Sequence, residues 1–231
     1  MNSLKINTFH MKLIALVFMV IDHIAFTLIP TNTAIYLVMR CLGRIAAPLF
    51  WFSFVEGYKH TSNKKRYFLR LLMAGICMGA VNVAFKVLYG INITFLNPNM
   101  FITLSAIILL LELYKSYQRT DGSSTMIFKT VALLTLSYLI SQYLEYGPFV
   151  VIIAPILYFV ENRWMKTWLH CVASFCICLY LGNIPQMTMI VSGFLFLCYS
   201  NQKPTKSWKW FFYIFYPLHF WILLTIRLIF F

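Results

Sequence analysis

Long apolar segments alternate with short polar segments along nearly the whole chain. Most apolar segments approach the roughly 20 residues that an α-helix needs to cross a bilayer. The segment at 147–160 is shorter, contains Pro148 and Pro155, and could be re-entrant or tilted. The pattern predicts an all-α integral membrane protein, a bundle of about nine transmembrane helices forming one domain over residues 1–231. The expected spans are 12–29, 33–57, 67–89, 100–117, 126–144, 147–160, 165–182, 184–200 and 208–229.

The composition supports a membrane protein and excludes a soluble one. Hydrophobic residues make up 61% of the chain and charged residues only 11%, whereas a soluble domain carries about 25% charged residues. The six cysteines lie in apolar stretches, so we expect neither a disulfide framework nor a metal site. Any chemistry is therefore expected within the bilayer or at its faces.

Basic residues are concentrated in alternate loops. The N-terminus and the segments "YKHTSNKKRYFLR", "YKSYQRTDGSSTMIFK", "ENRWMK" and "NQKPTKSWK" carry them, whereas "PTNT", "GINITFLNPN", "EYGP" and "GNIPQ" contain no lysine or arginine. The positive-inside rule therefore predicts that the N-terminus and every basic loop are cytoplasmic. Because the charges mark alternate loops and not one face, the net charge of +13 does not predict nucleic-acid binding.

A layer of polar side chains is expected near the middle of the bilayer. At 1.5 Å per residue, His23 lies roughly 16 Å beyond Lys12, and eleven steps of 100° place both on one helix face. A charged side chain at this depth costs roughly 2.5–3.5 kcal/mol on insertion scales unless it faces a cavity or another charge. An ion pair between Asp22 and an arginine is therefore the expected arrangement. The residues of this layer are Asp22, His23, Arg40, Arg44 and His219.

Each of these side chains also has a purely structural interpretation, as a buried ion pair or a hydrogen-bonded interior histidine. Glu56, near the cytoplasmic end of the second span, can simply pair with Lys59 or Arg70. A histidine beside a carboxylate and arginines also suits general-base catalysis. Intramembrane charges form proton relays in transporters, although the absence of an inverted repeat disfavours a proton-coupled transporter here. A non-catalytic assembly factor in conjugation or secretion is a further alternative.

Three sequence blocks at the beginning and end of the chain resemble the signature blocks of the TraX family. They are "LIALVFMVIDHIAF", "RCLGRIAAPLFWFSFVEGYKHTSNKKRYFLRLL" and "FFYIFYPLHFWILL". The family is named for the F-pilin acetylation protein of conjugative plasmids. It is similar to transmembrane acyltransferases such as acyltransferase family 3, whose first span carries an arginine and a histidine separated by ten residues. Lys12 and His23 have the same spacing, with lysine in the arginine position.

The resemblance implies a multi-pass acetyltransferase of the bacterial cytoplasmic (inner) membrane that uses acetyl-CoA from the cytoplasm and no metal. The acceptor would be an amine or hydroxyl at or across the membrane, on a pilin N-terminus, another peptide or a glycan. His23 would be the general base and Asp22 would orient it. Arg44, with Arg40, would hold the thioester carbonyl or stabilise the developing oxyanion.

The resemblance also assigns residues to the rest of the site. His219, after a kink expected at Pro217, would close the cavity opposite the first span. Whether His23 or His219 is the base stays open. Basic side chains of the second block offer charge for the phosphates of coenzyme A. The residues expected to contact the acyl donor are Lys12, Glu56, His60, Lys64, Lys65, Arg66, Arg70 and Tyr216.

Overall fold

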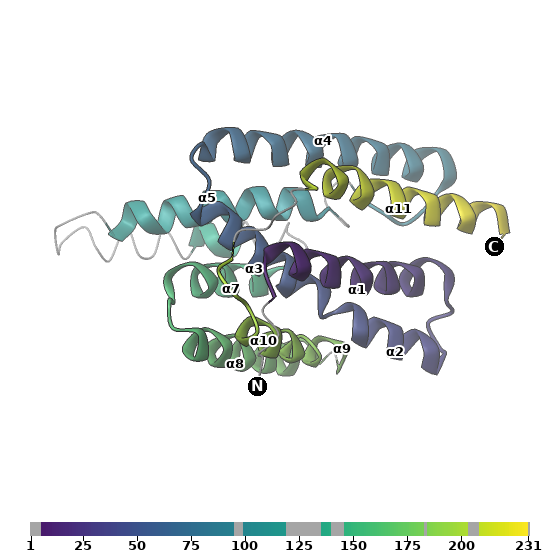
Figure 1. The fold of residues 1–231 in the computed structure, drawn as a ribbon. Helices are drawn as coiled ribbons and strands as arrows, with labels where there is room; N and C mark the ends of the chain where they lie inside the picture. The colour runs from purple at the N-terminus through teal and green to yellow at the C-terminus, as the bar shows by residue number, and fades with distance from the viewer. Residues whose placement is uncertain are drawn as a thin grey trace. The chain divides into compact units, whose positions relative to one another are not determined.

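Helices form the regular structure of the chain (Figure 1). The computed structural model describes residues 6–94, 99–118, 135–139, 146–182, 184–202 and 208–230. Within these ranges the strand-like pairing is confined to an isolated bridge between Ile6 and Tyr199. The chain divides into two compact units, one formed by residues 1–59 and 160–231 and the other by residues 60–159. That they act together as one transmembrane domain stays a prediction.

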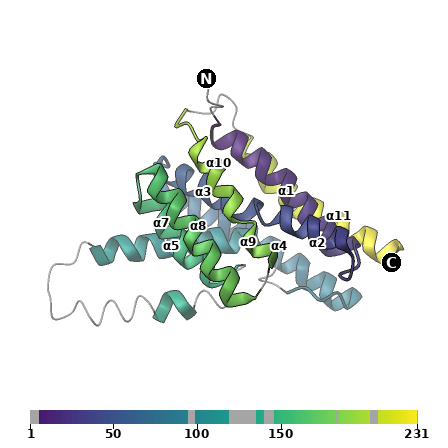
Figure 2. The same cartoon turned by 90° about the horizontal axis from the view of Figure 1, so that it is seen from below.

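The first unit is built around α1. This helix packs against α2, α3 and α11, and α10 packs against α8 and α3. Figures 1 and 2 both show α1 and α11 running side by side, and α8 beside α10. The helices of this unit are α1 (Thr8–Leu28), α2 (Ala34–Gly43), α3 (Ala46–Lys59), α8 (Arg163–Leu181), α9 (Ile184–Met187), α10 (Ile190–Leu197) and α11 (Lys209–Phe230).

The second expected span is broken in the middle. α2 ends at Gly43 and α3 begins at Ala46, so the backbone turns at Arg44 and Ile45. The N–H of Ile45 donates to the carbonyl of Leu42 at 3.2 Å, one residue closer than in an α-helix. The carbonyl of Cys41 is thereby left for another donor, and it accepts a hydrogen bond from the hydroxyl of Thr188. An interrupted helix within the membrane needs such replacement partners.

Polar contacts tie several chain segments together at one end of this unit. The N–H of Ile6 donates to the carbonyl of Cys198 at 3.1 Å, and the N–H of Ser200 donates to the carbonyl of Ile6 at 2.8 Å. Arg163 at the start of α8 donates to the carbonyl of Tyr199 at 2.8 Å. The beginning of α1, the beginning of α8 and the end of α10 therefore lie at the same end. The charge pattern predicts that all three belong to the cytoplasmic membrane face, and this assignment to a membrane face stays a prediction.

The second unit contains α4 (Lys64–Tyr89), α5 (Met100–Gln118) and α7 (Pro148–Phe159), with α5 packed against both others. Gly75 lets α4 approach α5, because an added Cβ would lie 2.6 Å from the side chain of Ile102. Asn99 joins the two helices. Its amide donates to the carbonyl of Gly75 at 2.9 Å, and its side-chain oxygen accepts from the N–H of Ile102 at 3.4 Å.

The prediction of a multi-pass helical membrane protein is confirmed. Among the described residues, six helices are long and apolar enough to cross a membrane. The expected spans at 147–160 and 184–200 correspond to shorter apolar helices. The expected span at 126–144 falls outside the described residues except for 135–139, which are helical. The number nine therefore stays a prediction. The six long helices cover Thr8–Leu28, Ala34–Lys59, Lys64–Tyr89, Met100–Tyr117, Arg163–Leu181 and Trp210–Phe230.

Candidate functional site

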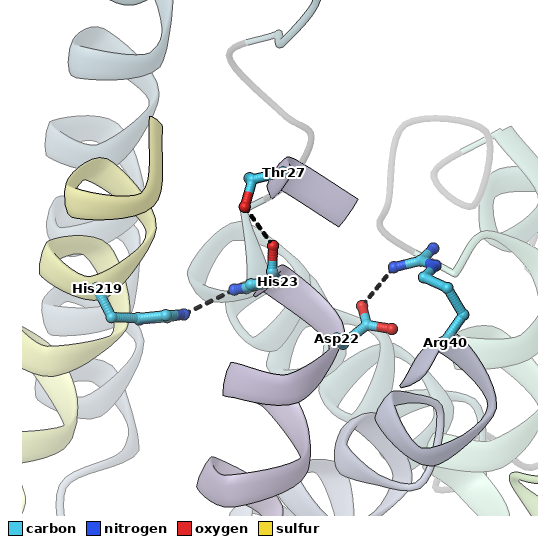
Figure 3. Close-up of polar contacts among 5 residues, drawn as sticks. All are labelled: Asp22, His23, Thr27, Arg40 and His219. Atoms are coloured by element: carbon cyan, nitrogen blue, oxygen red, sulfur yellow. Dashed lines mark hydrogen bonds and ion pairs between the residues drawn. The ribbon is translucent and has the colours of Figure 1, made fainter. Parts of the chain in front are cut away.

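Asp22 and His23 are neighbours on α1, yet they contact different helices (Figure 3). Consecutive residues on a helix point about 100° apart. The carboxylate of Asp22 pairs with Arg40 of α2, at 2.6 Å between Oδ2 and Nη1. The side chain of Asp22 is 9% exposed and that of Arg40 15%. The predicted ion pair between Asp22 and an arginine is therefore present, and Arg40 lies within hydrogen-bonding distance.

His23 contacts His219 of α11. Its Nδ1 lies 2.7 Å from Nε2 of His219, and the two ring planes differ by only 6°. Both residues are buried. Depth counting along the sequence placed the two histidines in one layer, and the structure brings them into direct contact.

The partners of His219 determine which nitrogens carry protons. Its Nδ1 lies 2.8 Å from the carbonyl oxygen of Phe215. A carbonyl only accepts, so this Nδ1 must be protonated, and in a neutral imidazole Nε2 is then an acceptor. His23 must therefore donate from Nδ1, which leaves its Nε2 with a lone pair. The pair is a directed hydrogen-bond chain that ends in an unprotonated nitrogen on His23.

Aromatic rings and a threonine surround this pair. The centre of the Phe220 ring lies 5.3 Å from the centre of the His23 ring, and the centre of the Tyr216 ring lies 6.2 Å from the same point. The hydroxyl of Thr27 donates to the carbonyl of His23 at 2.6 Å. Tyr216, expected to contact the acyl donor, is thus a neighbour of the histidines, 5.9 Å from the ring of His219.

Arg44 occupies the break between α2 and α3. It is the C-terminal cap residue of α2, and its N–H donates to the carbonyls of Arg40 and Leu42. Its guanidinium is close enough to interact electrostatically with both Asp22 and His23. All five members of the expected polar layer therefore lie around α1, with Arg40 and Arg44 near Asp22 and His219 beside His23.

Lys12 lies on the face of α1 that packs against α11. Its ammonium is 5.7 Å from the centre of the Phe212 ring. His23 contacts His219 on the same helix, so the prediction that Lys12 and His23 share one face is confirmed. His219 itself lies two residues after Pro217, within a helix that is continuous from Lys209 to Phe230.

Glu56 forms the centre of a second charged cluster, at the end of α3. Its Oε1 lies 2.9 Å from the ammonium of Lys59, which confirms one of the two expected partners. It also lies 3.7 Å from the ammonium of Lys166 on α8. The charge pattern grouped Lys166 with the basic loop "ENRWMK", but it lies within α8 and is only 6% exposed. The sequence did indicate this burial, because Lys166 lies within the apolar span expected at 165–182.

The other residues expected to hold the acyl donor belong to the second unit. His60 is exposed, and the guanidinium of Arg70 stands over the ring of Tyr67 at 5.8 Å. Their role beside Glu56 stays a prediction. Besides His60 and Arg70, these residues are Lys64, Lys65 and Arg66, in the first turn of α4.

A third polar cluster was not expected from the sequence. His170 of α8 is fully buried, and its Nε2 lies 3.0 Å from the carbonyl of Met189 and 2.8 Å from the hydroxyl of Ser192. Thr167 donates to the carbonyl of Gly193 at 3.2 Å. Because the Ser192 hydroxyl itself donates to Met189 at 2.6 Å, these bonds fasten α10 to α8.

Comparisons with known proteins match nearly the whole chain. The model of a family described as TraX protein matches residues 8–227. A protein of Dichelobacter nodosus, described as probable fimbrial assembly protein FimC, serogroup H1, is 24% identical over 245 residues, which cover 98% of each chain. No solved structure matches this chain.

Proposed function

Because this chain belongs to the TraX protein family, we propose that it is a membrane-embedded acetyltransferase. It moves an acetyl group from cytoplasmic acetyl-CoA to an amine or hydroxyl at or across the membrane. The observation that carries the proposal is the directed hydrogen-bond chain from His23 through His219 to the carbonyl of Phe215. That chain leaves an unprotonated nitrogen, His23 Nε2, inside a membrane protein, as a general base requires.

In the proposed reaction His23 takes up one proton and later gives it back. Nε2 of His23 accepts the proton from the acceptor amine or hydroxyl as the acceptor attacks the thioester carbonyl. The new C–N or C–O bond forms a tetrahedral intermediate, and the C–S bond then breaks. The departing thiolate of coenzyme A receives the proton from His23. His219 orients the imidazole by accepting from Nδ1, which makes it a positioning residue.

The arginines have different roles in this mechanism. Arg44 stabilises the negative oxygen of the intermediate, because its guanidinium is close enough to interact with His23. Arg40 is paired with Asp22 at 2.6 Å and holds the carboxylate against α2. Asp22 therefore fixes α1 beside Arg40 and Arg44, while His219 takes over the orienting role that the resemblance gave to Asp22.

The proposed role is related to pili. The relative from Dichelobacter nodosus is described as a probable fimbrial assembly protein, and the TraX family is named for pilin acetylation. A pilin N-terminus is therefore the first acceptor to test. Another peptide or a glycan would use the same proton transfer, because each supplies an amine or hydroxyl.

The test measures acetyl transfer by the purified protein in lipid nanodiscs with radiolabelled acetyl-CoA. Wild type should release coenzyme A and label the acceptor, and His23→Ala should lower the rate by about 10²–10⁴-fold. The matched control is His10→Ala, because His10 is an exposed residue of the same helix. If wild-type protein neither binds acetyl-CoA nor releases coenzyme A, the proposed acetyltransferase activity is excluded. Full activity of His23→Ala would exclude only the assignment of the base.

A non-catalytic role in pilus assembly is the second candidate, and the description of the relative favours it. The two candidates differ in what His23 must do in cells. If the protein is an assembly factor, His23→Ala at wild-type abundance should restore pili to a deletion strain. If it is an enzyme whose product is needed for assembly, the same variant should fail while His10→Ala succeeds.

A further inference from the structure

The cluster around Glu56 holds more positive than negative charge in a buried place. The ammonium groups of Lys59 and Lys166 both approach the same carboxylate oxygen, Oε1, at 2.9 and 3.7 Å. The side chain of Glu56 is 9% exposed and that of Lys166 is 7% exposed. One carboxylate thus faces two ammonium groups, in surroundings where water screens charge poorly.

The contact between Lys166 and Glu56 is longer than a charge-assisted hydrogen bond. Charge-assisted hydrogen bonds from nitrogen to a carboxylate are about 2.7–2.9 Å long, and the distance to Glu56 is 3.7 Å. Lys166 also lies beside the ring of Phe52, whose centre is 5.5 Å from Nζ, and beside the side-chain amine of Lys59. Lys59 makes the shorter contact with Glu56, so the two lysine side chains share one carboxylate oxygen.

A third cation and a neutral phenol complete this surface. Arg163, one turn before Lys166 on α8, donates to the carbonyl of Tyr199 at 2.8 Å. The ring of Tyr199 packs edge-on against Phe52 at 4.9 Å. The hydroxyl of Tyr199 donates to the side-chain oxygen of Asn201 at 3.4 Å and adds no negative charge to the cluster.

We propose that Lys59, Lys166 and Arg163 bind a phosphate group where α3 ends and α8 begins. Lysine ammonium groups bind phosphate as point charges, and arginine adds directed donors. A phosphate would neutralise the excess charge that one carboxylate leaves. Phosphate binding itself follows from this cluster alone. Its assignment to coenzyme A rests on the proposed acetyltransferase activity, since an anionic phospholipid carries the same group.

The position of the cluster fits a donor that enters from the end of the bundle. Tyr199 joins the cluster to the beginning of α1 through its bridge with Ile6. Along α1, His23 lies about 16 Å beyond Lys12 at 1.5 Å per residue. Coenzyme A carries its phosphates at one end of a long arm and its thioester at the other. The phosphates can therefore stay at this end while the thioester reaches the depth of His23.

The experiment compares two donors on the purified full-length protein. Acetyl-CoA carries the phosphates, and S-acetylpantetheine lacks them. In phosphatidylcholine nanodiscs, Lys166→Met should weaken acetyl-CoA binding by roughly tenfold or more and leave S-acetylpantetheine binding unchanged. Glu56→Gln should strengthen acetyl-CoA binding, because it removes the competing carboxylate. The control is Lys86→Met, an exposed lysine of α4, which should change neither.

A second measurement, with an anionic lipid, distinguishes coenzyme A from a phospholipid as the source of the phosphate. Phosphatidylglycerol could stabilise wild type against heat but not Lys166→Met, while acetyl-CoA binding is absent or is unchanged by the substitution. That result would support a phosphate site and overturn its assignment to coenzyme A. If neither ligand depends on Lys166, the phosphate site is overturned even where wild type is an active acetyltransferase. Should Lys166→Met not fold, Lys166→Arg must retain acetyl-CoA binding and Glu56→Gln must strengthen it. Failure of either variant overturns the proposal.

Discussion

Gly43 of α2 lies directly against the side chain of Asp22 on α1. A Cβ added to Gly43 would overlap Cβ, Cγ and Oδ1 of Asp22. Arg40 is one turn earlier on the same face of α2, and it reaches the other oxygen, Oδ2. Gly43 therefore leaves room for the Asp22 side chain against α2, and the guanidinium of Arg40 binds its carboxylate.

Gly43→Ala should destabilise the protein because the new methyl group has no room. Overpacking of this kind costs about 1–3 kcal/mol, so the thermal midpoint in detergent should fall. Gly57→Ala is the matched control, since an added Cβ there meets nothing within 4 Å. Equal stability of Gly43→Ala and wild type would contradict the close approach of α1 and α2.

A double-mutant cycle tests the ion pair between Asp22 and Arg40. Removing one partner of a buried pair leaves an uncompensated charge and costs about 3–5 kcal/mol. Asp22→Asn and Arg40→Met should each lower stability, and the double variant should lose much less than the sum of the two. The control pair is Glu112 and Lys115, at 3.1 Å, whose carboxylate is 50% exposed. Its coupling should be below about 1 kcal/mol, and similar coupling in both pairs would contradict the prediction.

Depth counting predicted much of the polar layer because the membrane restricts where charges can lie. A carboxylate in mid-membrane needs a nearby cation, and only Arg40 and Arg44 were available at that depth in the adjoining span. Arg40 pairs with this carboxylate at 2.6 Å. The direct contact between His23 and His219 could not be predicted, because sequence gives depth and helix face but not which helices are neighbours.

The break at residues 43–45 and the burial of Lys166 were missed for different reasons. Hydropathy averages over a window, so a run that is apolar throughout predicts one continuous helix. Gly43 and Pro48 were the local signals, and Pro48 lies in the first turn of α3, where no N–H is needed. Lys166 was grouped with a loop by charge alone. Its burial depends on Glu56, a tertiary contact far away in sequence.

Thr188→Val should destabilise the interrupted helix. The hydroxyl of Thr188 donates to the carbonyl of Cys41, which the break deprives of its usual backbone donor. A buried acceptor left without its donor costs about 1–3 kcal/mol, and valine keeps the shape of the side chain. Thr225→Val is the control, since that exposed hydroxyl donates within its own helix, to Trp221. Thermal unfolding should separate the two variants, and an equal effect of both would contradict this role of Thr188.

Substitution of His219 tests the direction of the hydrogen-bond chain. The side-chain oxygen of glutamine can accept from Nδ1 of His23, whereas leucine cannot. His219→Leu should therefore lower kcat by about tenfold to a hundredfold, as expected for 1–3 kcal/mol, and His219→Gln should retain more of it. The measurement is the acetyl-transfer rate at saturating donor. If glutamine and leucine reduce kcat equally, His219 does not position His23 by accepting a hydrogen bond.

Cysteine labelling tests the orientation of the bundle. Asn32 follows α1 and Asn201 follows α10, and both are exposed. Asn201 lies near Tyr199, which is bridged to Ile6 at the beginning of α1. The 21 residues of α1 extend about 31 Å at 1.5 Å per residue, so Asn32 is at the opposite face.

The positive-inside rule predicts that Asn201 faces the cytoplasm and Asn32 the outside. In a variant whose six free cysteines are replaced by alanine, a membrane-impermeant maleimide should label Asn32→Cys in intact spheroplasts. It should label Asn201→Cys only in inverted vesicles. The reverse result would invert the topology and place the cluster of Lys59, Lys166 and Arg163 away from cytoplasmic coenzyme A. Labelling of both positions from one side would contradict α1 as a membrane span, because its two ends would then share a face.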